Sequence, residues 1–450
     1  MAQFSAEKSW SQVDLVRETF HYQSRFYGST MVFKIDYPVT LDPLFPSLVK
    51  DLALLAKTGF RVVIVPGSKE WIDTVLNKYD IVSKYRENLR ITAEGAMPFV
   101  QMAAFHSATR FMTNLSAAQI SNIRVEAVIG NFVRARGLGV LDGVDMEHTG
   151  TVDKIYIDSI NRVLELGMIP IIPCIGWSPA GKPYNVSSDE IACHAAVKLK
   201  AIKLFIISHG GGIKKGAFEI PENIETGEDG HVMRLTPHEA KRILKLNVSK
   251  TDNDKNLKEL ALALKASEAG VERVHIINGA EEGAVLRELF SNLGAGTMVY
   301  ADEYESIRAL RSNDIPDILR LMEPLMQEGY LIRRTPEDIQ NKKDDYAVFE
   351  IDGQIHACGA LHNWGESQGE IAAIATDSGY ADLGLGRRVV SFFIDRAQKS
   401  GLRRVFVLTT RTHDWFEALG FRESTVETLP AKKRETYDTS RNSKVFALEL

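Results

Sequence analysis

The sequence predicts an α/β protein in which a parallel-sheet sandwich precedes a smaller α+β domain. Through residues 29–300, short apolar runs alternate with amphipathic helical patterns, which is typical of a parallel sheet covered by helices. From about residue 301, strand patterns follow one another directly. The chain has 450 residues, more than one hydrophobic core usually organises. We therefore expect an N-terminal helix at 1–28, an α/β domain at 29–300 and an α+β domain at 301–450.

The elements of the first domain follow from apolar periodicity. An amphipathic helix is expected over 11–27, where apolar residues recur at roughly helical spacing: Val13, Val16, Phe20 and Tyr22. Apolar runs predict strands at 31–35, 61–67, 126–135, 169–176, 203–208 and 273–278. Helical patterns lie at 43–58, directly after 67, and at 153–167, 187–201 and 255–269. The polar stretch 223–256 is expected to be a surface excursion.

The second domain starts with a helix over 314–328. Two strands follow, joined by the hairpin signal Asp352-Gly353. The remaining pattern is a strand at 369–376, a helix at 384–399, a strand at 403–411 and a helix at 413–421.

Composition narrows the class of protein. The net charge is −5, which gives no reason to expect a nucleic-acid or anionic-membrane partner. Cys174, Cys193 and Cys358 lack paired or metal-ligand spacing, so we expect a reducing compartment and no metal. The first 25 residues carry charges throughout, unlike a signal peptide, and no apolar run approaches the ~20 residues that span a bilayer. A cytoplasmic protein is the expectation.

A glycine-containing loop before the helix at 384–399 is a candidate anion site. Gly384 and Gly386 allow the backbone to approach a ligand closely, and the helix start offers unpaired N–H groups and a favourable dipole. Arg387 and Arg388 add positive charge. A pyrophosphate would suit this site, although the same glycines are equally consistent with a plain turn.

This order of elements resembles the GCN5-related N-acetyltransferase superfamily, whose acetyl-CoA loop reads Gln/Arg-x-x-Gly-x-Gly/Ala. Here Ala381 departs from the first position, which removes a side chain but not the backbone cradle. The stretch WFEALGF (415–421) resembles a second signature of the same superfamily. The resemblance implies acetyl-CoA as co-substrate, and we expect it to contact Ile374, Ala375, Thr376, Ala381, Asp382, Leu383, Gly384, Leu385, Gly386 and Arg387.

Acetyl transfer to an amine requires a base for the ammonium, a polarised thioester carbonyl and a proton for the leaving thiolate. Glu370, on the strand before the loop, is the candidate base; the alternative is an exposed strand carboxylate. Thr409 is the candidate acid, although threonine is also a good strand former. Backbone N–H groups near Ala373 would bind the carbonyl oxygen.

Four segments together resemble the N-acetylglutamate synthase family over nearly the whole chain: 330–334, 369–370, 405–421 and 440–445. The resemblance implies acetylation of L-glutamate, the first step of arginine synthesis. It places Glu370 and Thr409 in the roles just given, and it assigns glutamate binding to Leu331, Arg333, Arg441, Ser443 and Lys444. An arginine can engage a carboxylate bidentately, though either arginine alone would equally suit a solvated surface.

Residues 30–300 resemble the amino-acid-kinase fold, so the whole chain is expected to be an amino-acid-kinase-like sandwich plus an acetyltransferase fold. Lys34, Arg90 and Asp189 match kinase positions. The glycines that should follow the first strand are replaced, however, by Ile35-Asp36-Tyr37, and Asp36 would repel phosphates. We expect no ATP phosphorylation.

The stretch 278–299 resembles the arginine-inhibitor segment of arginine-sensitive relatives. By this match Glu288 faces the guanidinium, backbone at Gly294 and Gly296 holds the rest, and Tyr22 borders the site. Without the match, Glu288 would be an ordinary residue of an amphipathic helix. We expect feedback inhibition by arginine, and a homohexamer built around the N-terminal helix.

Two other functions remain open at this point. A bifunctional synthase and kinase is favoured by Lys34 and Asp189 and opposed by Asp36-Tyr37. A catalytically silent arginine-binding regulatory protein is suggested by Ala381 alone.

Overall fold

The computed structural model divides into two compact units, Met1–Ala301 and Asp302–Leu450. The structure describes residues 20, 23–24, 26–86, 89–117, 125–221, 224, 226–227, 230–251, 253–290, 296–300, 305–351, 354–377 and 384–450, with only the backbone at 305–306. Most of the expected helix at 11–27, including Tyr22, lies outside these residues. The hairpin residues Asp352 and Gly353 also lie outside them.

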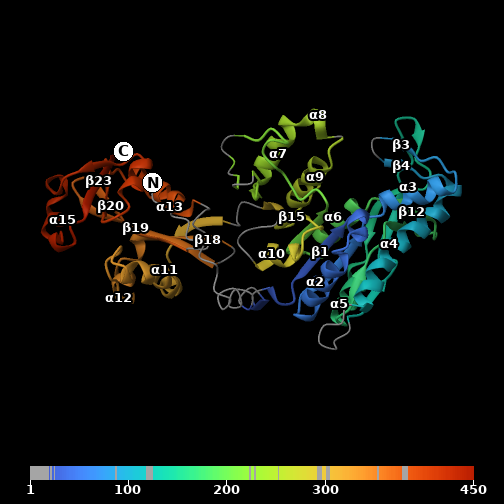
Figure 1. Ribbon diagram of the computed structural model, residues 1–450, viewed down its shortest axis with the longest axis horizontal. Coiled ribbons are helices and arrows are strands. Elements are labelled where there is room, and N and C mark those ends of the chain that lie inside the picture. Colours follow the sequence, from blue (N-terminus) through green and yellow to red (C-terminus); the bar gives the residue numbers. More distant parts are fainter. Residues whose placement is uncertain are drawn as a thin grey trace. The chain divides into compact units, whose positions relative to one another are not determined.

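The first unit contains a sheet with helices around it (Figure 1). The sheet has eight strands, and every neighbouring pair except one is parallel, as predicted for this domain. The exception is the antiparallel pair β15–β16. In spatial order the strands are β14 (Arg234–Leu235), β16 (Gly296–Tyr300), β15 (Arg273–Asn278), β13 (Lys203–Ser208), β1 (Thr30–Ile35), β2 (Arg61–Pro66), β10 (Ile169–Ile171) and β5 (Ala127–Ile129).

Helices cover both faces of this sheet, because side chains alternate along each buried strand. On β1, Val32 packs into one apolar cluster and Phe33 into another. The Val32 side is covered by α5 (Ile157–Glu165), α6 (Ser188–Lys198), α7 (Pro237–Leu246) and α9 (Lys255–Glu268). The Phe33 side is covered by α2 (Phe45–Lys57), α4 (Met97–Ala117) and α10 (Ala284–Phe290).

A small closed barrel lies beside the sheet, and it corrects two predicted strands. Its strands are β6 (Val133–Gly137), β9 (Thr149–Ile155), β11 (Ile175–Trp177) and β12 (Pro183–Val186). The runs 126–135 and 169–176 each contain two strands, one in the sheet and one in the barrel. Gly130 and Pro173 stand at the two breaks, and proline cannot donate a ladder hydrogen bond.

Among the described residues of the first unit, the remaining α-helices and strands are short. They are α3 (Lys69–Lys78), α8 (Val248–Thr251), β3 (Lys84–Arg86), β4 (Leu89–Ile91), β7 (Val140–Leu141) and β8 (Val144–Asp145).

The second unit is one seven-stranded sheet between helices. Its spatial order is β17 (Glu305–Ala309), β18 (Tyr346–Ile351), β19 (Gln354–Gly365), β20 (Gln368–Thr376), β21 (Arg404–Thr409), β23 (Lys444–Glu449) and β22 (Arg422–Ser424). On β18, Phe349 packs with α13 (Leu385–Lys399), while Val348 packs with α11 (Ile315–Gln327), so the two helices cover opposite faces. The described part of the unit also has three shorter α-helices: α12 (Pro336–Asn341), α14 (His413–Ala418) and α15 (Ala431–Glu435).

Candidate functional site

Two central strands of the second unit separate part of the way along their length. The pair β20–β21 is parallel, and its ladder runs only from Gln368↔Arg404 to Glu370↔Phe406. Beyond it, β20 continues to Thr376 and β21 to Thr409, with no ladder pair joining these described residues. The facing edge of β20 therefore offers backbone N–H and C=O groups to a ligand.

A β-bulge interrupts β20 within this separated stretch. Ala373 is buried and has φ +56°, and the register with β19 shifts between Cys358 and Ala360. A bulge changes the direction in which the backbone groups after it point. The N–H groups expected to bind a carbonyl oxygen thus follow an irregularity in the strand.

The start of α13 lies against the end of β20. Gly384 is the residue before the helix and has φ +61°. A side chain at Gly386 would have its Cβ 3.3 Å from the Trp415 ring and 3.5 Å from Cγ2 of Thr376. The two sequence signatures, the glycine loop and WFEALGF, therefore meet at Gly386. This helix N-terminus suits an anion, and Arg387 is exposed beside it.

The carboxylate of Glu370 is inside the unit, with 6% of the residue exposed. Its Oε1 and Oε2 lie 2.9 and 2.7 Å from Nζ of Lys433, and Trp364 Nε1 donates to Oε2 at 2.8 Å. The alternative of an exposed strand carboxylate is therefore wrong. Glu370 also stands at the last ladder pair before the strands separate.

Thr409 ends β21 and connects it to α14. Its hydroxyl accepts the N–H of Thr412 at 3.0 Å and shares a hydrogen bond with the Thr412 hydroxyl at 2.7 Å. In this second bond either oxygen can donate, so the Thr409 proton is not committed to one partner.

Two segments predicted to hold the acceptor come together although they are about a hundred residues apart. Arg441 donates to the carbonyl oxygens of Gly329 and Tyr330 at 2.9 and 3.3 Å. The following Leu331 is half-buried and Arg333 is exposed.

The rest of the terminal segment is held by other contacts. The Ser443 carbonyl accepts a 2.6 Å hydrogen bond from the Tyr437 hydroxyl, and Lys444 pairs with Thr409 in the β21–β23 ladder. The ammonium of Lys444 is 3.2 Å from Glu423 at the surface.

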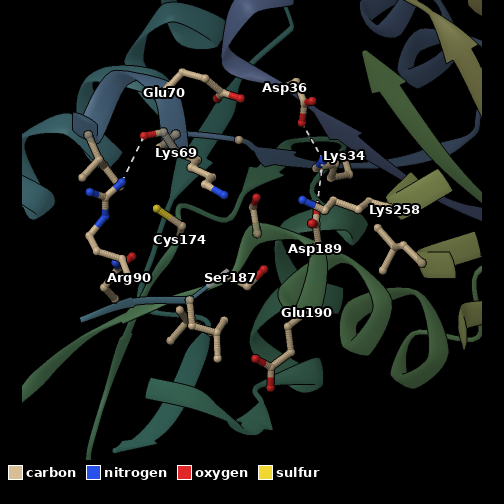
Figure 2. A pocket seen from close by; sticks show the side chains of 18 of the residues that line it. Lys34, Asp36, Lys69, Glu70, Arg90, Cys174, Ser187, Asp189, Glu190 and Lys258 are labelled. Atoms are coloured by element: carbon tan, nitrogen blue, oxygen red, sulfur yellow. Dashed lines mark hydrogen bonds and ion pairs between the residues drawn. The ribbon is translucent and has the colours of Figure 1, made fainter. Parts of the chain in front are cut away.

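The first unit has a cavity of about 470 Å³ where the kinase-like residues gather (Figure 2). Lys34 is two residues after Val32 on β1 and therefore lies on the same side of the sheet, toward α6 and α9. Its ammonium lies 2.5 Å from Asp36 and 2.7 Å from Asp189. Figure 2 shows it between these two carboxylates. Lys255 lies 2.5 Å from the other oxygen of Asp36. The Asp36 carboxylate thus occupies two ammonium groups that would otherwise be available to a phosphate.

Charges in this cavity compensate one another. Burial lowers the pKa of Lys34, but the carboxylates of Asp189, Asp36 and Glu259 outweigh it and hold that pKa well above its ordinary value. Burial raises the pKa of Glu259 to about 7. Arg90, across the cavity, is 2.6 Å from Asp73.

Glu288, the predicted partner of a guanidinium, lies on α10 with 5% of its side chain exposed. Its Oε1 lies 2.6 Å from Nδ1 of His275. Burial lowers the pKa of His275 to about 4, leaving a neutral ring beside the carboxylate. A Cβ at Gly296 would overlap the carbonyl oxygen of Ile276 on β15. Tyr22, Gly294, Ala381, Asp382 and Leu383 lie outside the described residues.

Among the described residues, no group of three or more His, Cys, Asp or Glu side chains could hold a metal ion. None of the described helices is long and apolar enough to cross a membrane.

Two residues of the Glu370 site were missed by sequence reasoning. Lys433 lies in the basic run Lys432-Lys433-Arg434, which is typical of a solvated surface, and nothing in its spacing marks the central lysine as buried. Trp364 ends a strand pattern, and a tryptophan there is typical of packing.

Comparison with known proteins gives consistent results for both units. Residues 36–278 match the amino acid kinase family, and residues 315–421 match the acetyltransferase (GNAT) family. Amino-acid acetyltransferases from Salmonella typhimurium and Escherichia coli K12 are each 33% identical, over 99% of this chain and 99% of theirs.

Solved structures agree. Similar to this chain is N-acetylglutamate synthase from Neisseria gonorrhoeae complexed with coenzyme A and L-arginine. Its TM-score is 0.84 at 32% identity, and the match covers 98% of this chain and 100% of that one. The same synthase complexed with coenzyme A and N-acetylglutamate gives a TM-score of 0.61 at 32% identity and the same coverage.

Proposed function

The chain belongs to the amino-acid acetyltransferase family, and on that premise we propose that it transfers the acetyl group of acetyl-CoA to the amino group of L-glutamate. The observation that carries this proposal is the position of Glu370, a buried carboxylate where β20 and β21 separate. The separated edge of β20 ends at Thr376, next to the start of α13, so one extended co-substrate could place its thioester along the strand and its pyrophosphate at the helix start. The N-acetylglutamate synthase of N. gonorrhoeae, similar over nearly the whole chain, was solved with both coenzyme A and N-acetylglutamate.

Each described residue then has a chemical task. Acetyl-CoA supplies an activated thioester carbonyl. Glu370 takes a proton from the glutamate ammonium, directly or through water, and the amine nitrogen attacks the carbonyl carbon. Backbone N–H groups after Ala373 stabilise the developing oxyanion. As the C–S bond breaks, Thr409 gives its proton to the sulfur. The attacking nitrogen loses its second proton, which returns to Thr409 through solvent, and Glu370 releases its proton to solvent, so the products are N-acetylglutamate, CoA and one proton.

The acceptor is assigned through charge. The guanidinium groups of Arg333 and Arg441 lie on the two segments that meet at Tyr330, and two carboxylates distinguish glutamate from neutral amino acids. Ser443 and Lys444 complete the proposed binding segment.

One assay tests the activity: purified chain, acetyl-CoA and glutamate, with CoA release followed by thiol detection. Replacing glutamate with aspartate or glutamine tests the acceptor. We expect CoA release with glutamate at a rate well above the other two. No release with any acceptor would refute the transferase function and leave the arginine-binding regulator as the alternative.

We propose that the first unit binds arginine and does not phosphorylate. The absence of phosphorylation is supported by the Asp36 carboxylate, which pairs with both Lys34 and Lys255 in the cavity. Incubation with N-acetylglutamate and ATP should yield no ADP above the rate of ATP alone. Stoichiometric ADP would instead establish the bifunctional synthase and kinase.

We further propose an arginine site at Glu288, Gly296, Gly294 and Tyr22, with feedback inhibition, in a cytoplasmic homohexamer built around the N-terminal helix. The carboxylate of Glu288 is chemically suited to a guanidinium. Light scattering coupled to gel filtration tests the subunit number, with and without arginine.

A further inference from the structure

In an inference that rests on the proposed function, we propose that Lys433 is a positioning residue that keeps the Glu370 carboxylate ionised and oriented for proton transfer.

The Lys433 ammonium contacts both oxygens of the Glu370 carboxylate. One ammonium, Nζ of Lys433, lies 2.9 Å from Oε1 and 2.7 Å from Oε2 of Glu370. The same ammonium is 4.8 Å from the centre of the Trp364 ring, and the indole N–H of Trp364 donates to Oε2 at 2.8 Å. Three side chains therefore contact one another in pairs, which fixes the plane of the carboxylate.

In this buried place the Glu370 carboxylate is in contact with the Lys433 ammonium. A carboxylate removed from water without a partner takes up a proton, because burial disfavours its charged form. Here Glu370 is 6% exposed and Lys433 is 8% exposed. Since a buried ion pair seldom adds net stability, folding alone does not account for this pair. Ionisation of the proposed base does.

The backbone is arranged to deliver this one lysine. Helix α15 has only five residues, and its first N–H, from Ala431, donates to the Glu366 carboxylate at 3.0 Å. Glu366 has φ +51° in the turn between β19 and β20, the strand that carries Glu370. Lys432 and Arg434 are exposed on either side, so Lys433 alone of the basic run turns inward.

Two ladder neighbours of Glu370 among the described residues do not compete for its carboxylate, because one has another partner and one is apolar. His362 faces it across the β19–β20 ladder, and its Nδ1 is 2.6 Å from Asp345. On the other side, Phe406 of β21 is its ladder partner and is apolar. A change at Lys433 leaves all of these in place.

The test is the pH dependence of kcat/KM for glutamate in Lys433→Met. Without the ammonium, the acid limb of the profile should move to higher pH by about 1–3 units, with activity recovering toward alkaline pH. Lys433→Arg, which keeps a cation, should hold the limb within about half a unit of the wild type. Lys432→Met removes an exposed charge from the same helix and should leave the limb where it is.

A second readout does not depend on turnover. In infrared spectra near neutral pH, Lys433→Met should show the C=O band of a protonated carboxylic acid that the wild type lacks. The band should vanish in Lys433→Met combined with Glu370→Gln.

The outcomes separate this inference from the function. A wild-type chain that releases no CoA refutes the proposed function itself. An active wild type whose Lys433→Met variant loses rate equally at every pH, with no new infrared band, overturns the positioning role alone. If thermal unfolding shows that Lys433→Met does not fold, Lys433→Gln keeps a hydrogen-bond donor on a side chain one atom shorter while removing the charge, and an unmoved acid limb there has the same meaning.

Discussion

At the scale of single residues, Glu370 is the group on which the proposed chemistry depends. Glu370→Gln keeps the shape and a hydrogen-bonding side chain but cannot accept the proton. We expect turnover to fall on the order of 10²- to 10⁴-fold, because general-base catalysis contributes about that much. The matched control is Glu323→Gln on α11, an exposed glutamate. A near-normal rate in Glu370→Gln would assign deprotonation to another group or to water.

His275 carries a pH effect on stability. Its pKa in the folded chain is about 4, mainly because of burial, whereas an unfolded histidine titrates near its ordinary value of 6.5. Between about pH 6.5 and pH 4 the unfolded chain binds the extra proton, so the free energy of unfolding must fall as the pH falls through this window.

Urea unfolding of the first unit at about pH 7 and about pH 5 measures this dependence. His275→Gln should lose part of it, by up to about 3 kcal/mol over the full window. His238→Gln, an exposed histidine of α7, is the control. Identical pH dependence in His275→Gln and the wild type would mean that His275 is protonated in the folded chain.

At the scale of elements, the start of α13 governs co-substrate binding. Gly386→Ala places a methyl group 3.3 Å from Trp415, closer than most such contacts, and on the surface where N–H groups approach an anion. The KM for acetyl-CoA should rise about tenfold or more, with a smaller effect on the KM for glutamate. Steady-state kinetics with each substrate varied in turn measure both.

Gly95→Ala is the control for that substitution. A Cβ at Gly95 would have no neighbour within 4 Å, so its kinetics should match the wild type. An unchanged KM for acetyl-CoA in Gly386→Ala would place the pyrophosphate away from this helix start.

Elements with an isolated apolar pattern could be predicted from the sequence, and others could not. The strands at 203–208 and 273–278 are found with the predicted bounds, because each is a single buried run. The run 126–135 is one pattern but two strands, since periodicity does not register the bend at Gly130. Helix α4 was missed although its buried residues lie on one face, because apolar residues such as Phe99, Met102 and Met112 lie outside that face and blur the apolar periodicity.

Helix α7 was also missed, and here a usable signal existed. It lies inside the stretch taken for a polar excursion, yet Thr236 and Glu239 form a capping box around Pro237. That pattern marks a helix start from the sequence alone.

The candidate site could be predicted only as far as motifs reach. The glycine loop predicted the start of α13. The strand directly before that loop is β20, which carries Glu370. Lys433 is 63 residues further along and is buried only because α15 folds back onto the turn at Glu366. Which residue of a basic run turns inward is decided by tertiary packing, not by spacing.

At the scale of the whole molecule, the two units carry different proposed tasks, and binding equilibria would connect them. If arginine weakens coenzyme A binding by some factor, coenzyme A must weaken arginine binding by the same factor. Calorimetric titration of arginine, with and without saturating coenzyme A, should give dissociation constants differing by about 5- to 150-fold.

The matched variant for that titration is Glu288→Gln, in which the carboxylate offered to the guanidinium becomes neutral. Its affinity for arginine should drop by about 1.5–3 kcal/mol, since hydrogen bonds to charged groups are worth that much. Wild-type chain that shows no arginine binding heat at any temperature tested would remove the sensor role from the first unit.

The separation of β20 from β21 bears on how this enzyme tolerates mutation. Where a ligand is bound by main-chain groups, no single substitution can delete the contact, because every residue except proline carries the same N–H and C=O. Damage must instead come from changes that let the two strands close or shift. In a survey of random variants, the inactivating substitutions in β20 beyond Glu370 should therefore be those to larger side chains and to proline. Substitutions that change only the polarity of the side chain should have little effect.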